Sequence, residues 1–348
     1  MTAQTPPAPT PATAIAVHQT ARPHGFPTPD LFAFVKSSVP SPAPGTALVE
    51  NLYLSVDPYH REMMDGDFAL DAPLEGRALG RVLVSRDPGL AEGDLVFHRQ
   101  GWRTHALVTP GAAGTRKLRR YEGVPLVAHL SILGGTGLTA YVALTRTLRL
   151  AEGEDLFVSA AAGGVGTAAG RIARLLGAGR IIGSTGSAAK AAYLTEQVGY
   201  DAAFNYHEGP VGESLAKAAP DGIDACLDNV GGTHLEGAIS ALREHGRIAR
   251  VGTVAQYNAT EPPAAPRNLS DMVEKSLRME GMHVRNHTDV QGELEEFLVP
   301  HLRSGRISPD VTVTEGFGET VHAFLGMLRG DNTGKAVVHV ARPAARPA

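Results

Sequence analysis

The amino-acid sequence predicts a two-domain α/β protein, in which a compact β domain is joined to a doubly wound parallel sheet. Two patterns along the chain indicate this. From about Ala14 to Ala128, short apolar runs are broken by Pro, Gly and Asp, which is typical of barrel-like β domains. From Ser131 onward, apolar runs alternate with helical patterns, which favours right-handed crossovers between parallel strands. A chain of 348 residues is long enough for two such domains.

The expected elements can be read in chain order. Short strands bounded by turn residues are expected in the first part at Ala47–Leu54, Gly80–Val84 and Asp94–Phe97. Buried strands are expected in the second part at Leu156–Ala160, Arg180–Gly183, Ala202–Asn205, Ile223–Leu227 and Arg247–Val251. Helices are expected after the first of these strands as far as Leu176, and over Ala188–Val198 and Thr233–Leu242. A last strand, Ala336–Val340, is expected to close the first domain.

Composition narrows the possible functions. The net charge of −4 offers no basic surface for nucleic acid or for an acidic membrane. The single cysteine, Cys226, excludes an internal disulfide framework, and together with the absence of a signal sequence it favours a cytoplasmic protein. No apolar stretch approaches the roughly 18–20 residues of a membrane helix. The Pro- and Ala-rich ends, Met1–Thr13 and Arg342–Ala348, are expected to be disordered.

A glycine-rich turn joins the strand at Leu156–Ala160 to the following helix. A dinucleotide pyrophosphate binds backbone N–H groups at a helix N-terminus and needs residues without Cβ there. Gly163 and Gly166 occupy the second and third glycine positions of such a fingerprint, and Ala161 stands in the first. A tight packing turn is the alternative, but the β–α–β context favours dinucleotide binding. The cofactor-binding candidates in the turn are Gly163, Gly164, Val165 and Gly166.

The end of the next strand favours NADPH over NADH. NAD-binding sites usually place an acidic residue about 20 residues beyond the glycines, where it binds the ribose 2′-hydroxyl. Here Ser184 and the residues around it include no acid, and Lys190 follows shortly afterwards. A lysine attracts a 2′-phosphate, and one charge-assisted hydrogen bond is worth about 1.5–3 kcal/mol. The alternative for Lys190 is a solvated helix residue without a ligand.

The histidines and the cysteine do not form a recognisable metal site. Cys226 lies in an expected core strand, where a thiol is usually inert. His283 and His287 have a spacing that would pair them on a helix, but they lie at the end of a predicted strand. The sequence therefore predicts chemistry without a metal, carried by a cofactor and by protein hydrogen bonds.

Several motifs, in order and with near-family spacing, resemble those of the zinc-independent medium-chain dehydrogenases/reductases, specifically the prostaglandin/leukotriene reductase and plant alkenal double-bond reductase group. They are Asn51–Tyr59, Gly135–Tyr141, the turn Ala161–Gly166, Phe204–Tyr206, Asp228–Gly232, Gln256–Asn258 and Gly330–Lys335. The resemblance implies a GroES-like β-barrel domain built from residues 14–131 and 306–342, with a Rossmann domain at 132–305 inserted between them. It also implies a homodimer. The chain departs from the group at His60 and Glu62, and by one extra residue between Lys190 and Tyr206.

The resemblance also implies which residues form the site. Tyr257 is the implied hydrogen-bond donor to the substrate, and Tyr53 is implied to line the substrate pocket. Beyond the turn, the cofactor-binding residues are expected to be Ser184, Lys190, Tyr206, Asn229, Gly252, Met282, Val284 and Asn332. Lys190 and Tyr206 are the expected contacts of the 2′-phosphate.

The reaction implied by the resemblance is hydride transfer from NADPH to the β-carbon of an α,β-unsaturated aldehyde or ketone. Negative charge then builds on the carbonyl oxygen, and a phenol that is neutral at pH 7 can donate a hydrogen bond to it. Tyr257 is the candidate, although it is also compatible with packing against the nicotinamide without donating. Tyr53, on a strand, is as compatible with a core position as with ligand contact.

Two other functions stay open at this point. Reduction of quinones by NADPH would use the same fold and cofactor, and only the surroundings of Tyr257 and the Asp57-Pro58-Tyr59 stretch favour the alkenal group. A cofactor-binding protein without turnover is the second alternative.

Overall fold

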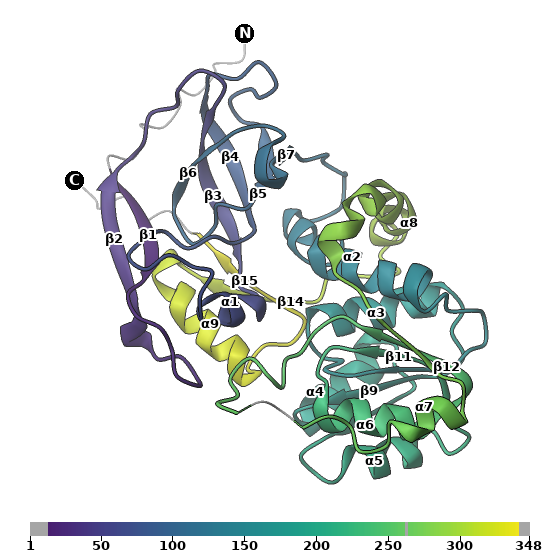
Figure 1. Ribbon diagram of the computed structural model, residues 1–348. Coiled ribbons are helices and arrows are strands. Elements are labelled where there is room, and N and C mark those ends of the chain that lie inside the picture. Colours follow the sequence, from purple (N-terminus) through teal and green to yellow (C-terminus); the bar gives the residue numbers. More distant parts are fainter. Residues whose placement is uncertain (1–12, 262–263, 341–348) are drawn as a thin grey trace.

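The computed structural model describes residues 13–261 and 264–340, and it forms two lobes (Figure 1). One lobe combines the N-terminal strands with the last strands of the chain, and the other contains the middle of the chain. The two tails that are expected to be disordered lie outside the described residues, as does the end of the segment 306–342. Thr13, assigned to the first tail from the sequence, instead begins the first strand.

The middle of the chain forms a six-stranded sheet in which all neighbouring strands are parallel. In spatial order the strands are β10 (Ala202–Asn205), β9 (Ile181–Thr185), β8 (Leu156–Val158), β11 (Ile223–Asp228), β12 (Leu242–Arg250) and β13 (Arg278–Gly281). Counted along the chain from β8, this is the 3-2-1-4-5-6 order of dinucleotide-binding sheets. The predicted doubly wound sheet is therefore confirmed.

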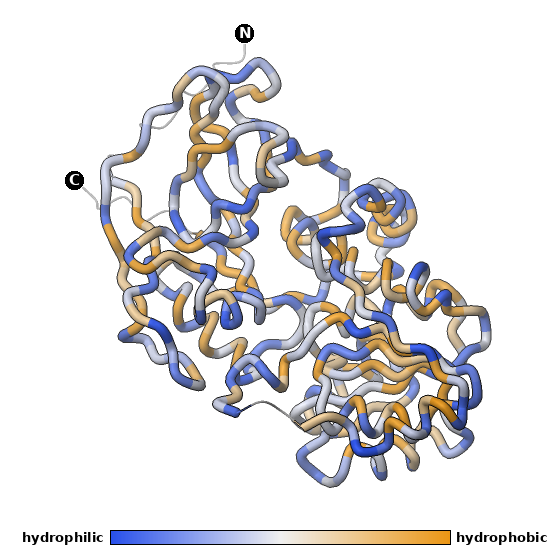
Figure 2. The backbone as a smooth tube through the Cα atoms, viewed as in Figure 1, coloured by the Kyte–Doolittle hydropathy of each residue, from blue (hydrophilic) through white to orange (hydrophobic). Residues whose placement is uncertain are grey.

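Helices cover both faces of this sheet because its strands are apolar on both sides. The helices of this lobe are α2 (Gly135–Val142), α3 (Gly164–Leu175), α4 (Ala188–Tyr193), α5 (Val211–Ala218), α6 (Gly232–Ala241), α7 (Ser270–Glu274) and α8 (Gln291–Arg303). Side chains alternate along a strand, so Leu156 and Val158 enter the core beneath α2, α3 and α8. Phe157 enters the opposite core beneath α5 and α6. The strands stand out as apolar in Figure 2.

The other lobe contains a seven-stranded mixed sheet and a hairpin. The hairpin is formed by β1 (Thr13–Gln19) and β2 (Phe32–Ser38). Along the sheet lie β14 (Val311–Glu315), β15 (Lys335–His339), β3 (Ala47–Ser55), β4 (Ala78–Ser85), β5 (Leu95–His98) and β7 (Arg116–Lys117), with β6 (His105–Val108) also paired to β3. The helices α1 (Tyr59–Met63) and α9 (Thr320–Arg329) flank it. The strand expected at Ala336–Val340 is β15, which pairs antiparallel with β3.

The helices follow the sequence pattern less closely than the strands. No helix is predicted between β10 and β11, where α5 lies. This helix buries only Val211 and Leu215, so its apolar pattern is too short to be distinctive. The helix predicted over Ala188–Val198 is α4 as far as Tyr193, and a wider helical turn then continues to Val198. That turn ends at Gly199, whose φ of 100° favours glycine.

Tyr200, which follows that turn, holds α3 against the sheet. Its hydroxyl donates a hydrogen bond to the carbonyl oxygen of Gly166 at 2.7 Å. A Cβ on Gly170 of α3 would lie 2.3 Å from the tyrosine ring, and a Cβ on Gly183 of β9 would lie 3.0 Å from it. At Gly170 the buried ring of Tyr200 occupies the space that a side chain would need, and at Gly183 this ring and the Cβ of Ala161 occupy it together.

We predict that Gly170→Ala destabilises the protein by about 1–3 kcal/mol, because the added methyl group overpacks the ring of Tyr200. Gly292→Ala is the matched control, since it lies in α8 and a Cβ there meets no atom within 4 Å. The control should be neutral or up to about 1 kcal/mol more stable than wild type. Urea unfolding measures both, and equal midpoints for the two variants would contradict the packing role of Tyr200.

Candidate active site

The glycine-rich turn leads from β8 into the N-terminus of α3. Gly163 precedes the helix in an extended conformation (φ −81°, ψ 177°) and carries no side chain to cap it. A Cβ on Gly166 would lie 2.4 Å from the carbonyl oxygen of Ala161, so only glycine lets the helix approach the turn this closely. Two of the first three N–H groups of α3, those of Gly164 and Gly166, therefore belong to residues without a Cβ. These features fit the pyrophosphate of a dinucleotide.

The turn also contacts the C-terminal segment of the chain. The backbone N–H of Gly334 donates to the carbonyl oxygen of Ala162 at 2.8 Å, and Gly334 forms an isolated bridge with Gly163. A Cβ on Gly164 would lie 3.2 Å from the Cα of Lys335. The cofactor turn is therefore packed against the residues that lead into β15.

The other cofactor candidates lie at or beyond the carboxyl ends of the parallel strands. Open α/β sheets bind their ligands at this edge. Ser184 lies in β9, Tyr206 follows β10, Asn229 follows β11, Gly252 follows β12, and Met282 and Val284 follow β13. The fold therefore brings together candidates that are distant in sequence.

The end of β9 carries the features expected of a site for the 2′-phosphate. Ser184 is fully buried, and its Oγ has no hydrogen-bond partner among the described residues. Lys190, on α4, is partly buried and its Nζ donates to the carbonyl oxygen of Gly330. Burial lowers the pKa of Lys190, and the charge of Asp331 opposes that shift. The lysine thus lies beside the loop that precedes β15.

Tyr206 lies on the other side of the loop that joins β9 to α4. A Cβ on Gly186 of that loop would lie 3.6 Å from the ring of Tyr206. Tyr206 is 38% exposed, and its ring centroid lies 4.1 Å from that of His207 and 5.1 Å from that of His234. Lys190 and Tyr206 therefore border the same loop, as expected for two contacts of one phosphate.

The ends of β8 and β11 are joined by a buried polar cluster. The Oδ1 of Asp228 accepts a hydrogen bond from the Ser159 Oγ at 2.7 Å, and its Oδ2 pairs with Arg250. The side-chain amide of Asn229 donates to the carbonyl oxygen of Ser159 at 2.7 Å. A Cβ on Gly252 would lie 2.9 Å from the carbonyl oxygen of Asn229. Ser159 is not singled out by the sequence, although a polar residue directly after a buried strand is a usable signal.

The remaining candidates have simpler surroundings. The side-chain amide of Asn332 donates to the carbonyl oxygen of Gly334 at 2.7 Å, beside the glycine turn. Met282 is buried and Val284 packs against the same core. Tyr53, on β3, stacks on His339 of β15 with ring centroids 4.8 Å apart. Tyr53 is not among the residues that line the pocket beside Tyr257, and its contact with substrate stays a prediction.

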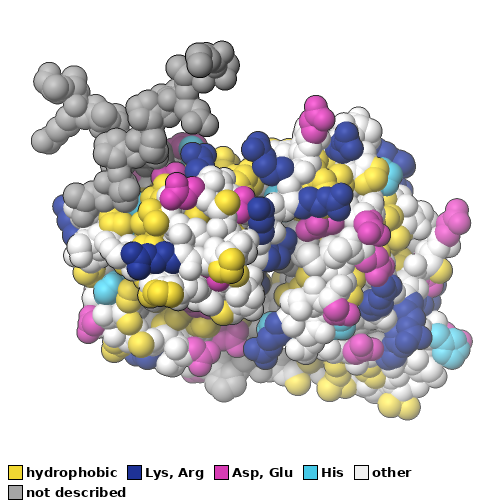
Figure 3. All heavy atoms as spheres, turned by 90° about the horizontal axis from the view of Figure 1, so that it is seen from above, with side chains coloured by type: hydrophobic (Ala, Val, Ile, Leu, Met, Phe, Trp, Pro, Cys, Tyr) yellow, Lys and Arg dark blue, Asp and Glu magenta, His cyan; other side chains and the backbone are white. Residues whose placement is uncertain are grey.

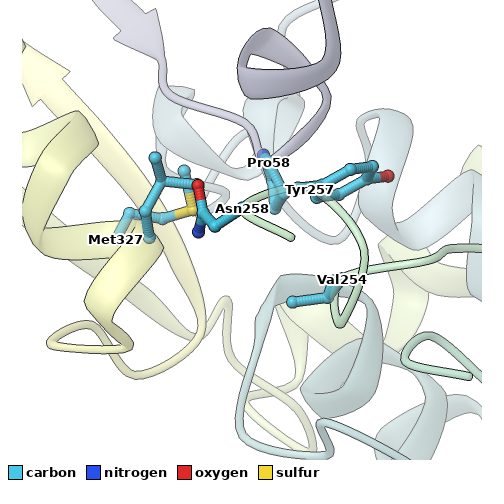
Figure 4. Close-up of a pocket in the computed structure, with 6 residues that line it drawn as sticks. Pro58, Val254, Tyr257, Asn258 and Met327 are labelled. Carbon is cyan, nitrogen blue, oxygen red and sulfur yellow. The ribbon is translucent and has the colours of Figure 1, made fainter. Parts of the chain in front are cut away.

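A small pocket of about 50 Å³ lies where three segments meet. They are the connection from β3 to α1, the loop after β12, and α9. Figure 4 shows Tyr257 beside Pro58, with its hydroxyl pointing away from Met327 and Asn258. The lining residues are Pro58, Val254, Tyr257, Asn258, Met327 and Leu328. Apart from Tyr257, the sequence does not predict this set, because no motif spacing connects α9 to a loop some 70 residues earlier.

Tyr257 is a neutral phenol in this setting. Burial raises its pKa above the ordinary value near 10, and the charge of Glu62 raises the pKa further. A hydrogen bond with Thr253 acts in the opposite direction. Because the net shift is upward, Tyr257 keeps its proton at pH 7 and can donate a hydrogen bond.

A buried carboxylate precedes Pro58. The Oδ2 of Asp57 accepts a hydrogen bond from the Ser55 Oγ at 2.6 Å and lies 3.3 Å from the Arg77 Nη1, while its Oδ1 lies 3.2 Å from the Lys335 Nζ. Burial alone would raise the pKa of Asp57, but the charges of Lys335 and Arg77 outweigh it and hold that pKa well below its usual range. Asp57 is therefore ionised and fixed in place.

Two family models match the chain. The N-terminal domain of oxidoreductase matches residues 16–116, and zinc-binding dehydrogenase matches residues 164–299. The NADP-dependent 2-alkenal reductase of Nicotiana tabacum is 36% identical over 318 residues, which cover 88% of this chain and 91% of the tobacco protein. Prostaglandin reductase 1 of Rattus norvegicus is 37% identical over 325 residues, which cover 90% of this chain and 95% of the rat protein.

Among solved structures, CurA from Vibrio vulnificus in complex with NADPH superposes with a TM-score of 0.88 at 30% identity. The match covers 94% of this chain and 100% of CurA. The chain belongs to the medium-chain dehydrogenase/reductase family. The resemblance to its prostaglandin and alkenal reductase group is thereby confirmed, together with the two-domain fold of this family.

One of the two matching family models is described as zinc-binding dehydrogenase, so the possible metal ligands matter. Within residues 13–261 and 264–340, no three or more His, Cys, Asp or Glu side chains are grouped so as to hold a metal ion. Cys226 is buried in β11, and burial raises the pKa of its thiol. His283 and His287 follow β13. Metal-free chemistry stays a prediction from the sequence.

Surface charge bears on nucleic-acid binding, and helix length bears on membrane spanning. Figure 3 shows a face on which basic and acidic side chains are interspersed, in keeping with the net charge of −4. Among the described helices, none is both long and apolar enough to cross a membrane.

His60 gives the folded chain a pH dependence that can be measured. Its Nδ1 accepts the backbone N–H of Asp57 at 3.2 Å, and the ring is buried. Burial lowers the pKa of His60 to about 4, although the charge of Asp57 opposes the shift. The unfolded chain binds a proton here near pH 6.5 and the folded chain does not until about pH 4, so acidification in this window favours unfolding.

We therefore predict that His60→Gln flattens the dependence of stability on pH. Between pH 6.5 and 4, the free energy of unfolding of the wild type should fall by up to about 1.4 kcal/mol per pH unit more than that of the variant. Urea unfolding at half-unit pH steps measures the difference. Parallel curves for the two proteins would show that His60 is protonated alike in both states.

Proposed function

We propose that this protein reduces the carbon–carbon double bond of α,β-unsaturated aldehydes or ketones with NADPH. The observation that carries the proposal is the position of Tyr257, a neutral phenol beside an apolar pocket, on the loop that follows β12 of the dinucleotide-binding sheet. The relatives from Nicotiana tabacum and Rattus norvegicus, named as 2-alkenal and prostaglandin reductases, support the same reading.

NADPH is the proposed cofactor because the turn, the acid-free end of β9 and Lys190 all suit it. The N-terminus of α3 would hold the pyrophosphate, and Lys190 and Tyr206 would hold the 2′-phosphate. When bound, NADPH supplies a hydride to the β-carbon of the substrate. Asn229, Gly252, Met282, Val284 and Asn332 would contact the rest of the cofactor along the carboxyl edge of the sheet.

Tyr257 is proposed to donate a hydrogen bond to the substrate carbonyl oxygen, where negative charge builds as the double bond is reduced. A donor that is already in place stabilises this charge most effectively where water is excluded. Pro58, Val254 and Met327 line the neighbouring pocket with apolar side chains. The raised pKa of Tyr257 keeps its proton in place across the neutral pH range.

The wider setting is proposed by analogy with the relatives. A cytoplasmic homodimer that acts on small enals or enones, without metal, nucleic acid or membrane, is the arrangement we infer.

We predict that the purified protein oxidises NADPH, followed at 340 nm, in the presence of enals or enones but not of simple alcohols. Tyr257→Phe should lower kcat about 10²- to 10³-fold, because it removes the main donor to the developing charge. Turnover of quinones and of no enal or enone would overturn the proposal. Near wild-type turnover by Tyr257→Phe would show that the ring only packs against the cofactor.

We predict that Lys190→Ala lowers the preference for NADPH over NADH by about 10- to 100-fold, since it removes one charge-assisted contact to the 2′-phosphate. Calorimetric titration with 2′,5′-ADP measures the same loss without turnover. Lys217→Ala, an exposed lysine on α5, is the matched control and should leave both values unchanged. An unaltered cofactor preference in Lys190→Ala would place the 2′-phosphate elsewhere.

A further inference from the structure

A buried ion pair connects Lys335, the first residue of β15, to Asp57, which lies between β3 and α1 beside the pocket. The Nζ of Lys335 lies 3.2 Å from the Oδ1 of Asp57, and both residues are at least 95% buried. The same ammonium group donates to the carbonyl oxygens of Val56 and Ala336. All three of its N–H donors therefore have partners, which fixes the side chain in one orientation.

Asp57 is bonded at several points to the segment that carries the pocket residue Pro58. Its carboxylate also binds Ser55 and Arg77, and its backbone N–H donates to the Nδ1 of His60. The next residue is Pro58, which lines the pocket beside Tyr257 (Figure 4). Because Asp57 is held on both sides, the position of Pro58 follows from the position of the ion pair.

The Lys335 end is held by the cofactor helix. The backbone N–H of Lys335 donates to the carbonyl oxygen of Asp310 at 2.8 Å. The carboxylate of Asp310 pairs with Arg171 of α3 through two hydrogen bonds, of 2.6 and 2.8 Å. One residue earlier, Gly334 is bonded to the glycine turn itself. Lys335 is thus fixed to both the turn and the body of α3.

Stability alone is a poor reason for such a pair. The desolvation of two buried charges cancels much of their attraction, and apolar residues of similar size often serve stability equally well. What an ion pair adds is a specific arrangement of the two segments that carry it. Here those segments belong to the proposed cofactor site and to the proposed substrate pocket.

We propose that Lys335 and Asp57 are a positioning pair that ties the cofactor turn to residues 56–64, the pocket segment that leads from β3 through α1, so that cofactor binding at the turn orders the segment that receives the substrate. Neither residue touches the reacting atoms. The inference rests on the proposed function for its effect on turnover, but only on cofactor binding for its effect on the pocket segment.

The first test uses Lys335→Met, which removes the ammonium group and leaves Asp57 paired with Arg77. The Kd for NADPH should stay within about twofold of wild type, because the turn is unchanged. The kcat for an enone should fall by about ten- to hundredfold, since misplacement of about 1 Å near a reacting centre has an effect of this size. The double variant Asp57→Asn/Lys335→Met removes both charges. Its unfolding temperature should lie closer to that of wild type than the unfolding temperature of Lys335→Met does, but its kcat should be as low as that of Lys335→Met.

The second test follows hydrogen exchange with NADPH alone. In wild type, NADPH should slow amide exchange both at residues 161–167 and at residues 56–64. In the single and double variants, protection should persist at 161–167 and disappear at 56–64. Arg247→Met, which breaks the ion pair with Glu154 away from this connection, is the matched control and should retain both protections and the wild-type kcat.

The outcomes separate the two proposals. Retained protection of residues 56–64 in the double variant, or a kcat that recovers with its thermal stability, would show that the pair is structural only and overturn the inference. The inference would also be overturned if Arg247→Met lost kcat in proportion to its loss of thermal stability. If no enal or enone reacts in wild type while Lys335→Met still loses protection at residues 56–64, the proposed function fails and the positioning pair stands.

Discussion

The close approach of α3 to the turn after β8 is the contact on which the rest of the site depends. At Gly166 the helix lies so near Ala161 that no Cβ fits, and Tyr200 fills the remaining space against Gly170. This packing places the N-terminus of α3 at the carboxyl edge of the sheet. Ser184, Tyr206, Asn229, Gly252, Met282 and Val284 lie along the same edge, because parallel strands all end there.

The second requirement is that the end of the chain returns to this edge. The residues before β15 bond to the glycine turn through Gly334, and β15 itself pairs with β3 of the other lobe. One segment therefore completes the mixed sheet and borders the cofactor turn. As a result, Gly334 and Lys335 connect two segments that do not bond to each other directly. These segments are the one that follows β3 and the turn that follows β8.

Buried charges mark these connections. Asp57, Asp228 and Asp310 are each at most 7% exposed, and each is paired with a basic residue from a different segment. A buried carboxylate destabilises a protein when it is left unpaired, so its basic partner has to lie beside it in the folded chain. Each pair therefore joins two separate segments of the chain around one buried carboxylate.

The sequence by itself determined the two-domain α/β fold, the parallel sheet and the glycine turn, because these depend on local patterns: short apolar runs, helical patterns between them, and glycines directly after a buried strand. It also identified Lys190, which follows the acid-free end of one expected strand, while Tyr206 and Asn229 came from the family resemblance. The sequence did not predict α5, whose apolar face is short. Only the tertiary structure decided that Met327 joins Tyr257 at one pocket and that Lys335 pairs with Asp57, because such contacts depend on how distant segments pack and leave no periodic trace along the chain.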